Sequence, residues 1–310
     1  MKIIKPKFWD KKNISLPSIF LFPLALFYQF ILKFKNYLTL QRNFNVPIIC
    51  IGNIYIGGTG KTPLAIKVFE FLKELKKQPV VIKKKYTNQL DEELLLKKYC
   101  NVIISSNRAD GIKEAIKKNY NVIILDDGYQ DLSIKKNLNI VCFHSSQKIG
   151  NGQTIPSGPL RESLKSLRNC DLIFYNGQKD ITFEEKLNKY NSKLKYIYFN
   201  YNSNNINNYK NKNLIAFAGI GNPDNFFNFL KKNNLNLVKE IYYPDHFKYS
   251  RKDLENLINL KEKMGALLVT TEKDYLRIET NYVKYFNFIS IQTKFESPEL
   301  FRKVISSNIL

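Results

Sequence analysis

Short apolar runs alternate with amphipathic stretches along most of the chain. Uninterrupted runs of β-branched and other apolar residues suit strands that are covered on both faces of a sheet. They predict strands at 46–51, 80–82, 102–104, 121–125, 140–143, 172–175, 196–199, 214–218 and 267–270. Helical spacing predicts helices at about 61–77, 225–232 and 251–263. The pattern as a whole predicts an α/β fold with a mostly parallel sheet flanked by helices.

The core pattern weakens once along the chain and divides it. The stretch 191–212 is rich in Asn and Lys and carries few apolar positions. We therefore place a domain boundary shortly before it. The prediction is a hydrophobic N-terminal segment over 1–40, a first α/β domain over 41–178 and a second, smaller α/β domain over 179–310.

The N-terminal run 14–32 is strongly apolar and contains no charged residue. It includes Pro17, Pro23 and Gln29, and it is close to the lower length limit for crossing a bilayer. Lysines flank it on both sides and no small-residue cleavage site follows, which disfavours a cleaved signal peptide. A helix that spans the membrane or lies in its interface fits better, and a buried core helix is the alternative.

The charge of the chain indicates an anionic partner without identifying it. The 310 residues include 49 Lys and Arg against 27 Asp and Glu, a formal net charge of +22. Nucleic acid, a membrane surface and a phosphorylated substrate all match this charge. Because the lysines are spread through the sequence, a generally solvated Lys-rich surface matches it equally well.

The cysteines give no sign of a disulfide framework or a zinc site. Cys50, Cys100, Cys142 and Cys170 lie far apart, and no two of them form a Cys-x-x-Cys pair. Buried free thiols in a reducing compartment are the expected state, with the cytoplasm as the default location.

A glycine-rich loop follows the first predicted strand. It runs Gly57-Gly58-Thr59-Gly60-Lys61-Thr62 and leads into a predicted helix, so its backbone N–H groups would face anionic oxygens. Lys61 would reach the β and γ phosphates of a nucleotide, and the Thr62 hydroxyl would bind Mg²⁺. Tyr55 stands where the strict phosphate-loop motif has its first Gly, so the motif is a variant. The predicted nucleotide site comprises Tyr55, Ile56, Gly57, Gly58, Thr59, Gly60, Lys61 and Thr62, and a purely structural glycine turn is the alternative.

Two further positions carry candidate chemistry. Asp126 and Asp127 end an apolar strand, where one carboxylate would hold Mg²⁺ and the other would orient its shell or a nucleophile. A strand-ending Asp turn is the alternative. His246 follows Asp245 in an aromatic loop, where an imidazole could orient or deprotonate a hydroxyl.

Six blocks, in order and over nearly the whole chain, resemble the tetraacyldisaccharide 4'-kinases, the lipid A kinases of Gram-negative bacteria. The matching segments are Val46-Pro47 with Gly52-Asn53 and 57–63, Asp126-Asp-Gly-Tyr-Gln130, Pro156-Ser-Gly-Pro-Leu-Arg-Glu162, Ala218-Gly-Ile-Gly-Asn-Pro223, Pro244-Asp-His246 and Thr271-Glu-Lys-Asp274. The resemblance implies transfer of the γ phosphate of ATP to the 4'-hydroxyl of a tetraacyl glucosamine disaccharide 1-phosphate. It implies ATP and Mg²⁺ as cofactors, two α/β domains with the kinase site in the first, and a place at the cytoplasmic face of the inner membrane. It implies no nucleic-acid partner, and no protein partner can be inferred.

The same resemblance assigns roles to single residues. Metal and nucleotide binding fall to Thr62, Asp126, Asp127, Gln130 and Glu162, together with Lys61 of the loop. Asp91 resembles the family's general base, working in partnership with His246. The chain departs from the family in three places: Lys84-Lys85-Tyr86 replaces Arg-Gly-Tyr, Leu90 and Glu93 replace Gly and Pro around Asp91, and Asp131 replaces His.

Two other classes of protein share features with this chain. Membrane-bound switch ATPases of the partitioning type share the Gly-Gly-x-Gly-Lys-Thr loop, but they place a Lys immediately before it, where this chain has Ile56. A nucleic-acid-binding NTPase is indicated by charge alone, with no block of basic and aromatic residues to support it.

Overall fold

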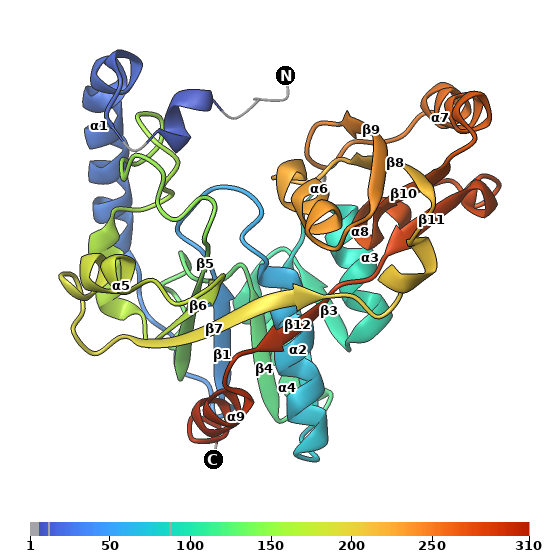
Figure 1. Ribbon diagram of the computed structural model, residues 1–310. Helices are drawn as coiled ribbons and strands as arrows, with labels where there is room; N and C mark the ends of the chain where they lie inside the picture. Colours follow the sequence, from blue (N-terminus) through green and yellow to red (C-terminus); the bar gives the residue numbers. More distant parts are fainter. Residues whose placement is uncertain (1–5, 12, 87–88, 310) are drawn as a thin grey trace. The chain divides into compact units, whose positions relative to one another are not determined.

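The computed structural model describes residues 6–11, 13–86 and 89–309 (Figure 1). The chain divides into two compact units. The small unit comprises Tyr86–Lys98 and Tyr201–Gln292. The large unit comprises the described residues up to 85, then Tyr99–Asn200, and the chain from residue 293 onward.

This division differs from the predicted boundary near residue 178. The chain continues in the large unit to Asn200, because the strands after residue 170 extend its sheet. Residues 86–98 belong to the small unit, and the chain returns to the large unit from Thr293. Each difference depends on pairing between segments that are far apart in sequence, which local composition does not reveal.

An eight-stranded sheet forms the centre of the large unit, in the order β12-β7-β6-β5-β1-β4-β2-β3. Strands β1 to β7 pair in parallel, as predicted. The strands are β1 (Ile48–Gly52), β2 (Pro79–Lys84), β3 (Val102–Ser105), β4 (Val122–Asp126), β5 (Leu138–His144), β6 (Leu172–Asn176), β7 (Lys195–Asn202) and β12 (Gln292–Phe295). All residues of β1, β4 and β6 are buried, which explains their unbroken apolar runs.

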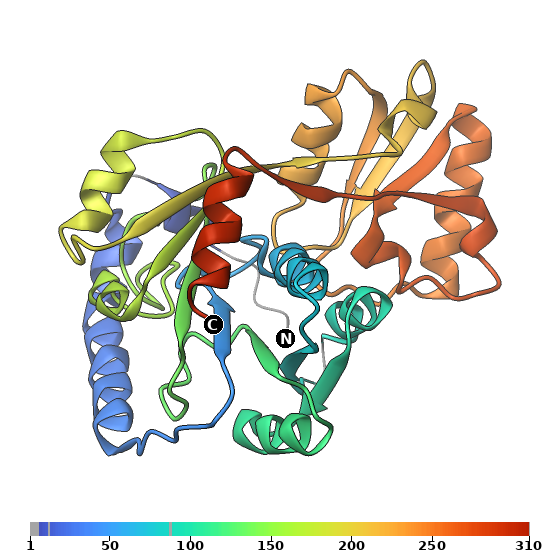
Figure 2. The same ribbon diagram turned by 90° about the horizontal axis from the view of Figure 1, so that it is seen from below.

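Helices cover both faces of this sheet. On one face, the rings of Phe71 and Phe301 lie 5.3 Å apart, and Phe301 lies 6.1 Å from Phe174 of β6. Figure 2 shows the two helices that carry Phe71 and Phe301 together on that side. Ile112 and Ala115 pack with the side chains of the opposite face. The helices of this unit that follow α1 are α2 (Lys61–Glu74), α4 (Arg108–Lys117), α5 (Ile181–Asn188) and α9 (Pro298–Ser306), with the 3₁₀ turn η2 (Leu164–Asn169).

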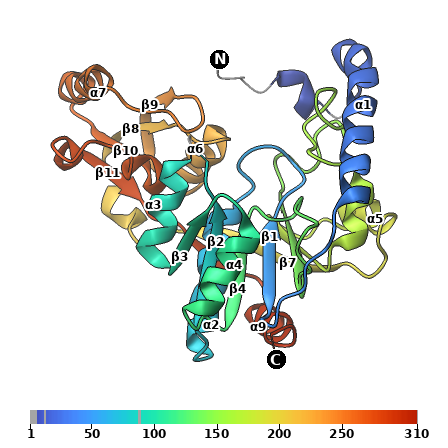
Figure 3. The same ribbon diagram turned by 180° about the vertical axis from the view of Figure 1, so that it is seen from behind.

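The small unit is built on a four-stranded parallel sheet in the order β11-β10-β8-β9, which can be followed in Figure 3. Alternate residues of β8 enter two apolar clusters: Leu214 packs with Phe227 on one face, and Phe217 packs with Leu254 on the other. The elements are β8 (Asn213–Ala218), β9 (Asn236–Tyr242), β10 (Leu267–Thr271), β11 (Phe286–Ile289), α3 (Leu90–Tyr99), α6 (Pro223–Lys232), α7 (Arg251–Met264) and α8 (Glu272–Tyr275).

Helix α1 (Leu16–Leu38) forms over the predicted apolar segment, and its polar residues Ser18 and Gln29 hydrogen-bond to a loop of the large unit. Asn151 Nδ2 donates to Ser18 Oγ at 3.0 Å, and Gln29 Nε2 donates to Thr154 Oγ1 at 2.9 Å. Figures 1 and 3 show α1 running alongside the loop that carries Asn151 and Thr154. Only 11% of its most apolar 18-residue window is buried, so the core-helix alternative is wrong. Among the described residues, α1 is the one helix long and apolar enough to cross a membrane, by length and composition.

Candidate active site

The glycine-rich loop connects β1 to α2 in the large unit. Gly60 caps α2 with φ = 85°, a left-handed backbone that glycine adopts without strain. The first N–H groups of α2 lack intrahelical partners and therefore suit an anionic ligand at this end. Tyr55 is fully buried and its hydroxyl contacts Asp10, while Ile56 N donates to Pro159 O at 2.9 Å. These contacts show Tyr55 and Ile56 bracing the start of the loop.

The side chain of Asn53 contacts several groups of the glycine-rich loop. Its side chain is fully buried, and Nδ2 lies 2.6 Å from Tyr55 O, 3.2 Å from Gly57 O and 2.9 Å from Thr59 Oγ1. Its Oδ1 accepts a hydrogen bond from Lys61 Nζ at 3.0 Å. The sequence predicted no role for Asn53. Its position between an apolar strand and a glycine-rich loop could have indicated one.

Lys61, Asp127 and Arg161 form an ionic cluster beside this loop. Lys61 Nζ lies 2.8 Å from Asp127 Oδ1, and Arg161 Nη1 donates to both carboxylate oxygens of Asp127 at 2.8 and 2.9 Å. Burial opposes ionisation of Asp127, but the charges of Lys61 and Arg161 outweigh it and hold its pKa far below the usual range. Asp127 is therefore ionised, and it holds Lys61 and Arg161 next to each other beside the glycine-rich loop, where both could bind an anionic phosphate.

Asp126 faces a different partner. Register places it beside Lys83 of β2, and the two side chains, each 1% exposed, form an ion pair of 2.9 Å. The second carboxylate oxygen of Asp126 is buried and has no hydrogen-bond partner among the described residues. A buried unpaired carboxylate oxygen is costly, so this atom is suited to a bound cation. Lys83 was not predicted as a site residue. A charged residue directly after an apolar strand could have indicated it.

The remaining predicted metal ligands are Thr62, Gln130 and Glu162. Thr62 is buried in the first turn of α2, and Gln130 Nε2 donates to Asn53 O at 2.8 Å. Burial raises the pKa of Glu162, against the opposing effects of the Ser166 hydroxyl, Lys136 and Arg161. The described residues contain no group of three or more His, Cys, Asp or Glu side chains placed to hold a metal. The hydroxyl of Thr62 and the carboxylates of Asp126 and Asp127 are nonetheless the hard oxygen donors that Mg²⁺ takes in small number.

The small unit brings Asp91 and His246 together. His246 Nδ1 lies 2.8 and 2.9 Å from the two carboxylate oxygens of Asp91. The Asp91 side chain is 1% exposed and that of His246 is 17% exposed. Burial opposes ionisation of Asp91, but the hydrogen bond from His246 and the charge of Lys273 outweigh it and lower its pKa. The pair is therefore a buried carboxylate with a partly exposed imidazole in front of it.

Two cations that were not predicted hold this carboxylate. Lys273 Nζ lies 3.4 Å from Asp91 Oδ2 and 3.0 Å from Glu92 Oε1, and Arg277 Nε lies 3.6 Å from Asp91 Oδ2. Burial works against the charge of Lys273, but Glu92 and Asp91 outweigh it and raise its pKa. Lys273 lies in the block Thr271-Glu-Lys-Asp274, which is part of the family resemblance. That block was the feature of the sequence that could have indicated a role for Lys273.

Comparison with known proteins gives a consistent result over most of the chain. Residues 17–309 match the family model described as tetraacyldisaccharide-1-P 4'-kinase. A tetraacyldisaccharide 4'-kinase of Pelagibacter ubique is 43% identical over 284 residues, 90% of each chain. One of Rickettsia canadensis is 36% identical over 296 residues, 89% of each chain. The crystal structure of LpxK from Aquifex aeolicus in complex with ATP superposes with a TM-score of 0.73 at 22% identity, covering 94% of this chain and 99% of that chain.

Proposed function

The chain belongs to the tetraacyldisaccharide-1-P 4'-kinase family, and we propose on this basis that its P-loop site moves the γ phosphate of ATP onto the 4'-hydroxyl of a tetraacyl disaccharide 1-phosphate. Family membership confirms the predicted ATP-dependent kinase, and the partitioning ATPase is not favoured. The observation that carries the site assignment is the cluster of Lys61, Asn53, Asp127 and Arg161 at the end of β1 and β4.

The experiment that tests this assignment compares two lysines of the same helix. Purified protein, ATP, Mg²⁺ and the disaccharide 1-phosphate should yield a bisphosphorylated lipid, which mass spectrometry detects. Lys61→Ala should abolish the product. Lys67→Ala, on the exposed side of α2, should retain it, because Lys67 pairs only with Glu70 within the described chain. Equal product from both variants would remove Lys61 from the site.

The large unit supplies binding and charge neutralisation. In phosphoryl transfer the protein mainly positions the groups and offsets charge, so Lys61 and Arg161 are proposed to contact the transferred phosphate. Thr62, Asp126 and Asp127 would hold Mg²⁺, assisted by Gln130 and Glu162. At this position Mg²⁺ would supply positive charge that offsets the negative charge of the phosphate oxygens. Asn53 keeps Lys61 pointed at the loop through its 3.0 Å hydrogen bond.

The small unit supplies the acid–base pair. Asp91 is almost fully buried and both of its oxygens face His246 Nδ1, so its side chain is placed to orient the imidazole. His246 is the more exposed of the two, and we assign to its Nε2 the proton of the sugar hydroxyl. In this assignment Asp91 assists the base, whereas the family resemblance gave Asp91 the role of base.

Helix α1 supports a place at the membrane. Between Leu16 and Ile31 its exposed side chains are all apolar, and Phe20, Phe27 and Phe30 are 82%, 63% and 65% exposed. Its inward side is the polar one, since Tyr28 Oη donates to Arg161 O at 3.0 Å. A soluble surface helix shows the reverse pattern. We therefore place α1 in the lipid interface, with the enzyme at the cytoplasmic face of the inner membrane, where a lipid-linked substrate would be met.

A further inference from the structure

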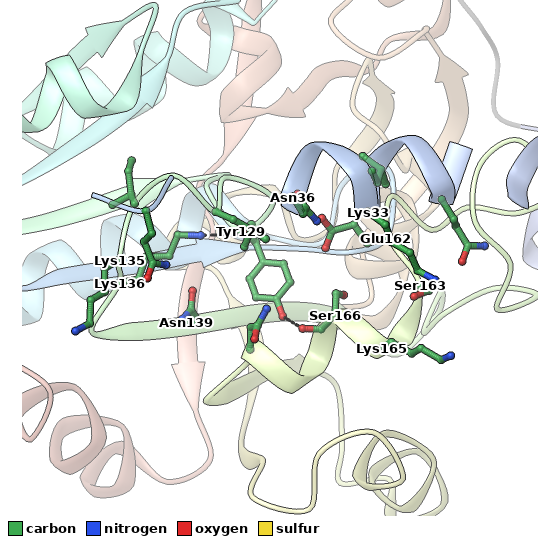
Figure 4. Close-up of a pocket in the computed structure, with 16 residues that line it drawn as sticks. Lys33, Asn36, Tyr129, Lys135, Lys136, Asn139, Glu162, Ser163, Lys165 and Ser166 are labelled. Atoms are coloured by element: carbon green, nitrogen blue, oxygen red, sulfur yellow. Dashed lines mark hydrogen bonds between the residues drawn. The ribbon is translucent and has the colours of Figure 1, made fainter. Parts of the chain in front are cut away.

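A cavity of about 460 Å³ lies in the large unit, beside the C-terminal half of α1 (Figure 4). Three segments that are distant in sequence line it: α1 from Gln29 to Asn36, the connection from β4 to β5, and the chain around η2. Its volume falls within the range of about 300 to 1,000 Å³ that is usual for ligand pockets. Apart from Glu162, none of its lining residues has a role in the proposed phosphoryl transfer.

The charge of this cavity is positive. Lys33, Lys135, Lys136 and Lys165 line it, against Glu162 as the single acid among the lining residues. Lys33, Lys135 and Lys165 have no ion-pair partner within the described part of the chain. Unpaired cations around a hollow raise the local concentration of anions.

The remaining lining groups suit a phosphate carried on a polar alcohol. Lys136 is held in place, since its Nζ donates to Gly128 O at 2.9 Å and to Tyr129 O at 3.1 Å. Amide and hydroxyl side chains add uncharged donors and acceptors, and Figure 4 shows several of them around Tyr129. The uncharged polar lining residues are Gln29, Asn36, Gln41, Asn139, Ser163, Ser166 and Asn169. Ammonium groups bind phosphate as point charges, and the amides and hydroxyls match ester and alcohol oxygens.

The position of the cavity along α1 identifies the source of that phosphate. The uncharged apolar run ends at Leu32, and Lys33 and Lys35 follow directly. Ile31 and Phe34 are 48% and 57% exposed, so apolar surface and lysines meet at this point of the helix. In an interfacial helix such a transition lies at the depth of the lipid headgroups, whose phosphates attract nearby lysines.

We propose that the cavity binds the phosphate of an anionic glycerophospholipid headgroup, and so fixes the enzyme on the membrane surface. This inference rests on the proposed placement of α1 in the lipid interface. The full chain is mixed with vesicles of phosphatidylcholine alone and with vesicles of equimolar phosphatidylcholine and phosphatidylglycerol, and the bound fraction is measured by flotation. Wild-type protein should bind both kinds and prefer the anionic vesicles. Lys135→Glu with Lys165→Glu should reduce this preference about tenfold or more.

Two variants separate a defined cavity from a diffuse basic surface. Lys73→Glu with Lys117→Glu, on α2 and α4, changes the net charge equally and should keep most of the preference. Asn169→Trp narrows the cavity without changing its charge and should reduce the preference. Equal losses in the two double variants, or no loss with Asn169→Trp, would overturn the proposal.

The substrate itself carries a phosphate, and kinetics distinguish this source. With the disaccharide 1-phosphate in neutral detergent micelles, Lys135→Glu with Lys165→Glu should leave KM unchanged. A raised KM with an unchanged vesicle preference would assign the cavity to the substrate and overturn the proposal. Wild-type protein that binds both vesicles equally would refute the headgroup site alone. Wild-type protein that binds neither would refute the placement of α1 as well.

Discussion

Replacing Lys83 by Met tests how tightly the end of β4 depends on a single buried cation. Lys83 and Asp126 are each 1% exposed and form an ion pair of 2.9 Å. Removing one partner of a buried pair leaves an uncompensated charge, which costs about 3 to 5 kcal/mol. We expect Lys83→Met to lower the free energy of unfolding by this amount, a large share of a typical stability of about 5 to 15 kcal/mol.

The assay is urea denaturation followed by circular dichroism, with two comparison variants. Lys118→Met removes a pair whose side chains are 58% and 47% exposed, and it should leave the free energy of unfolding nearly unchanged, because water screens exposed ion pairs. Lys83→Met with Asp126→Asn removes both charges and should recover at least about 2 kcal/mol of the loss. The double variant should still be a poor kinase, because it lacks the Asp126 carboxylate. A single variant as stable as wild type, or a double variant no more stable than the single one, would refute the reasoning.

The remaining predictions concern the two ionic sites and α1. His246→Gln should reduce kcat by about 100- to 10,000-fold, and Asp91→Asn should reduce it less, as stopped-time kinase assays would show; a larger loss in Asp91→Asn would contradict the assignment of the base. The lowered pKa of Asp127 means that its ionised form contributes stability above the ordinary Asp range near pH 4, and that this contribution is lost as the pH falls. Acid denaturation of Asp127→Asn should therefore show a flatter decline than wild type, and parallel curves would argue against the ion cluster. Phe27→Ser with Phe30→Ser should shift protein from the membrane to the soluble fraction, since each loses about 1.5 to 3 kcal/mol of apolar burial in lipid; an unchanged pellet would contradict the outward face.

The sequence predicted the strands well because their signal is local. The runs at 121–125 and 172–175 are buried on both faces and became β4 and β6. β9 was missed because its residues are exposed or intermediate, so it lacks an apolar run. α4 was missed although it is amphipathic, since Gly111 interrupts the pattern. A Cβ at Gly111 would lie 3.0 Å from Ile82, so close packing on β2 explains the glycine.

Only those parts of the candidate site that form continuous sequence motifs could be predicted. The loop ending at Lys61 and the acids ending β4 each form a continuous motif, and both were found. Lys83 lies beside Asp126 because of the register between β2 and β4, and this register cannot be deduced from the sequence. Arg161 reaches Asp127 through a loop that returns from 34 residues further along the chain. Pairing of this kind depends on the assembled sheet, and so only the family resemblance pointed to that segment.

The order of the two units along the chain has a consequence for synthesis on the ribosome. The small unit interrupts the large one, and β12 with α9 completes the large unit after residue 291. Phe301 supplies the ring that covers Phe71 and Phe174, so that apolar face stays uncovered until residue 301 has been made. Partly made chains of this kind aggregate readily. Deletion of α9 should therefore lower the folding yield more than deletion of an equal length of exposed chain elsewhere.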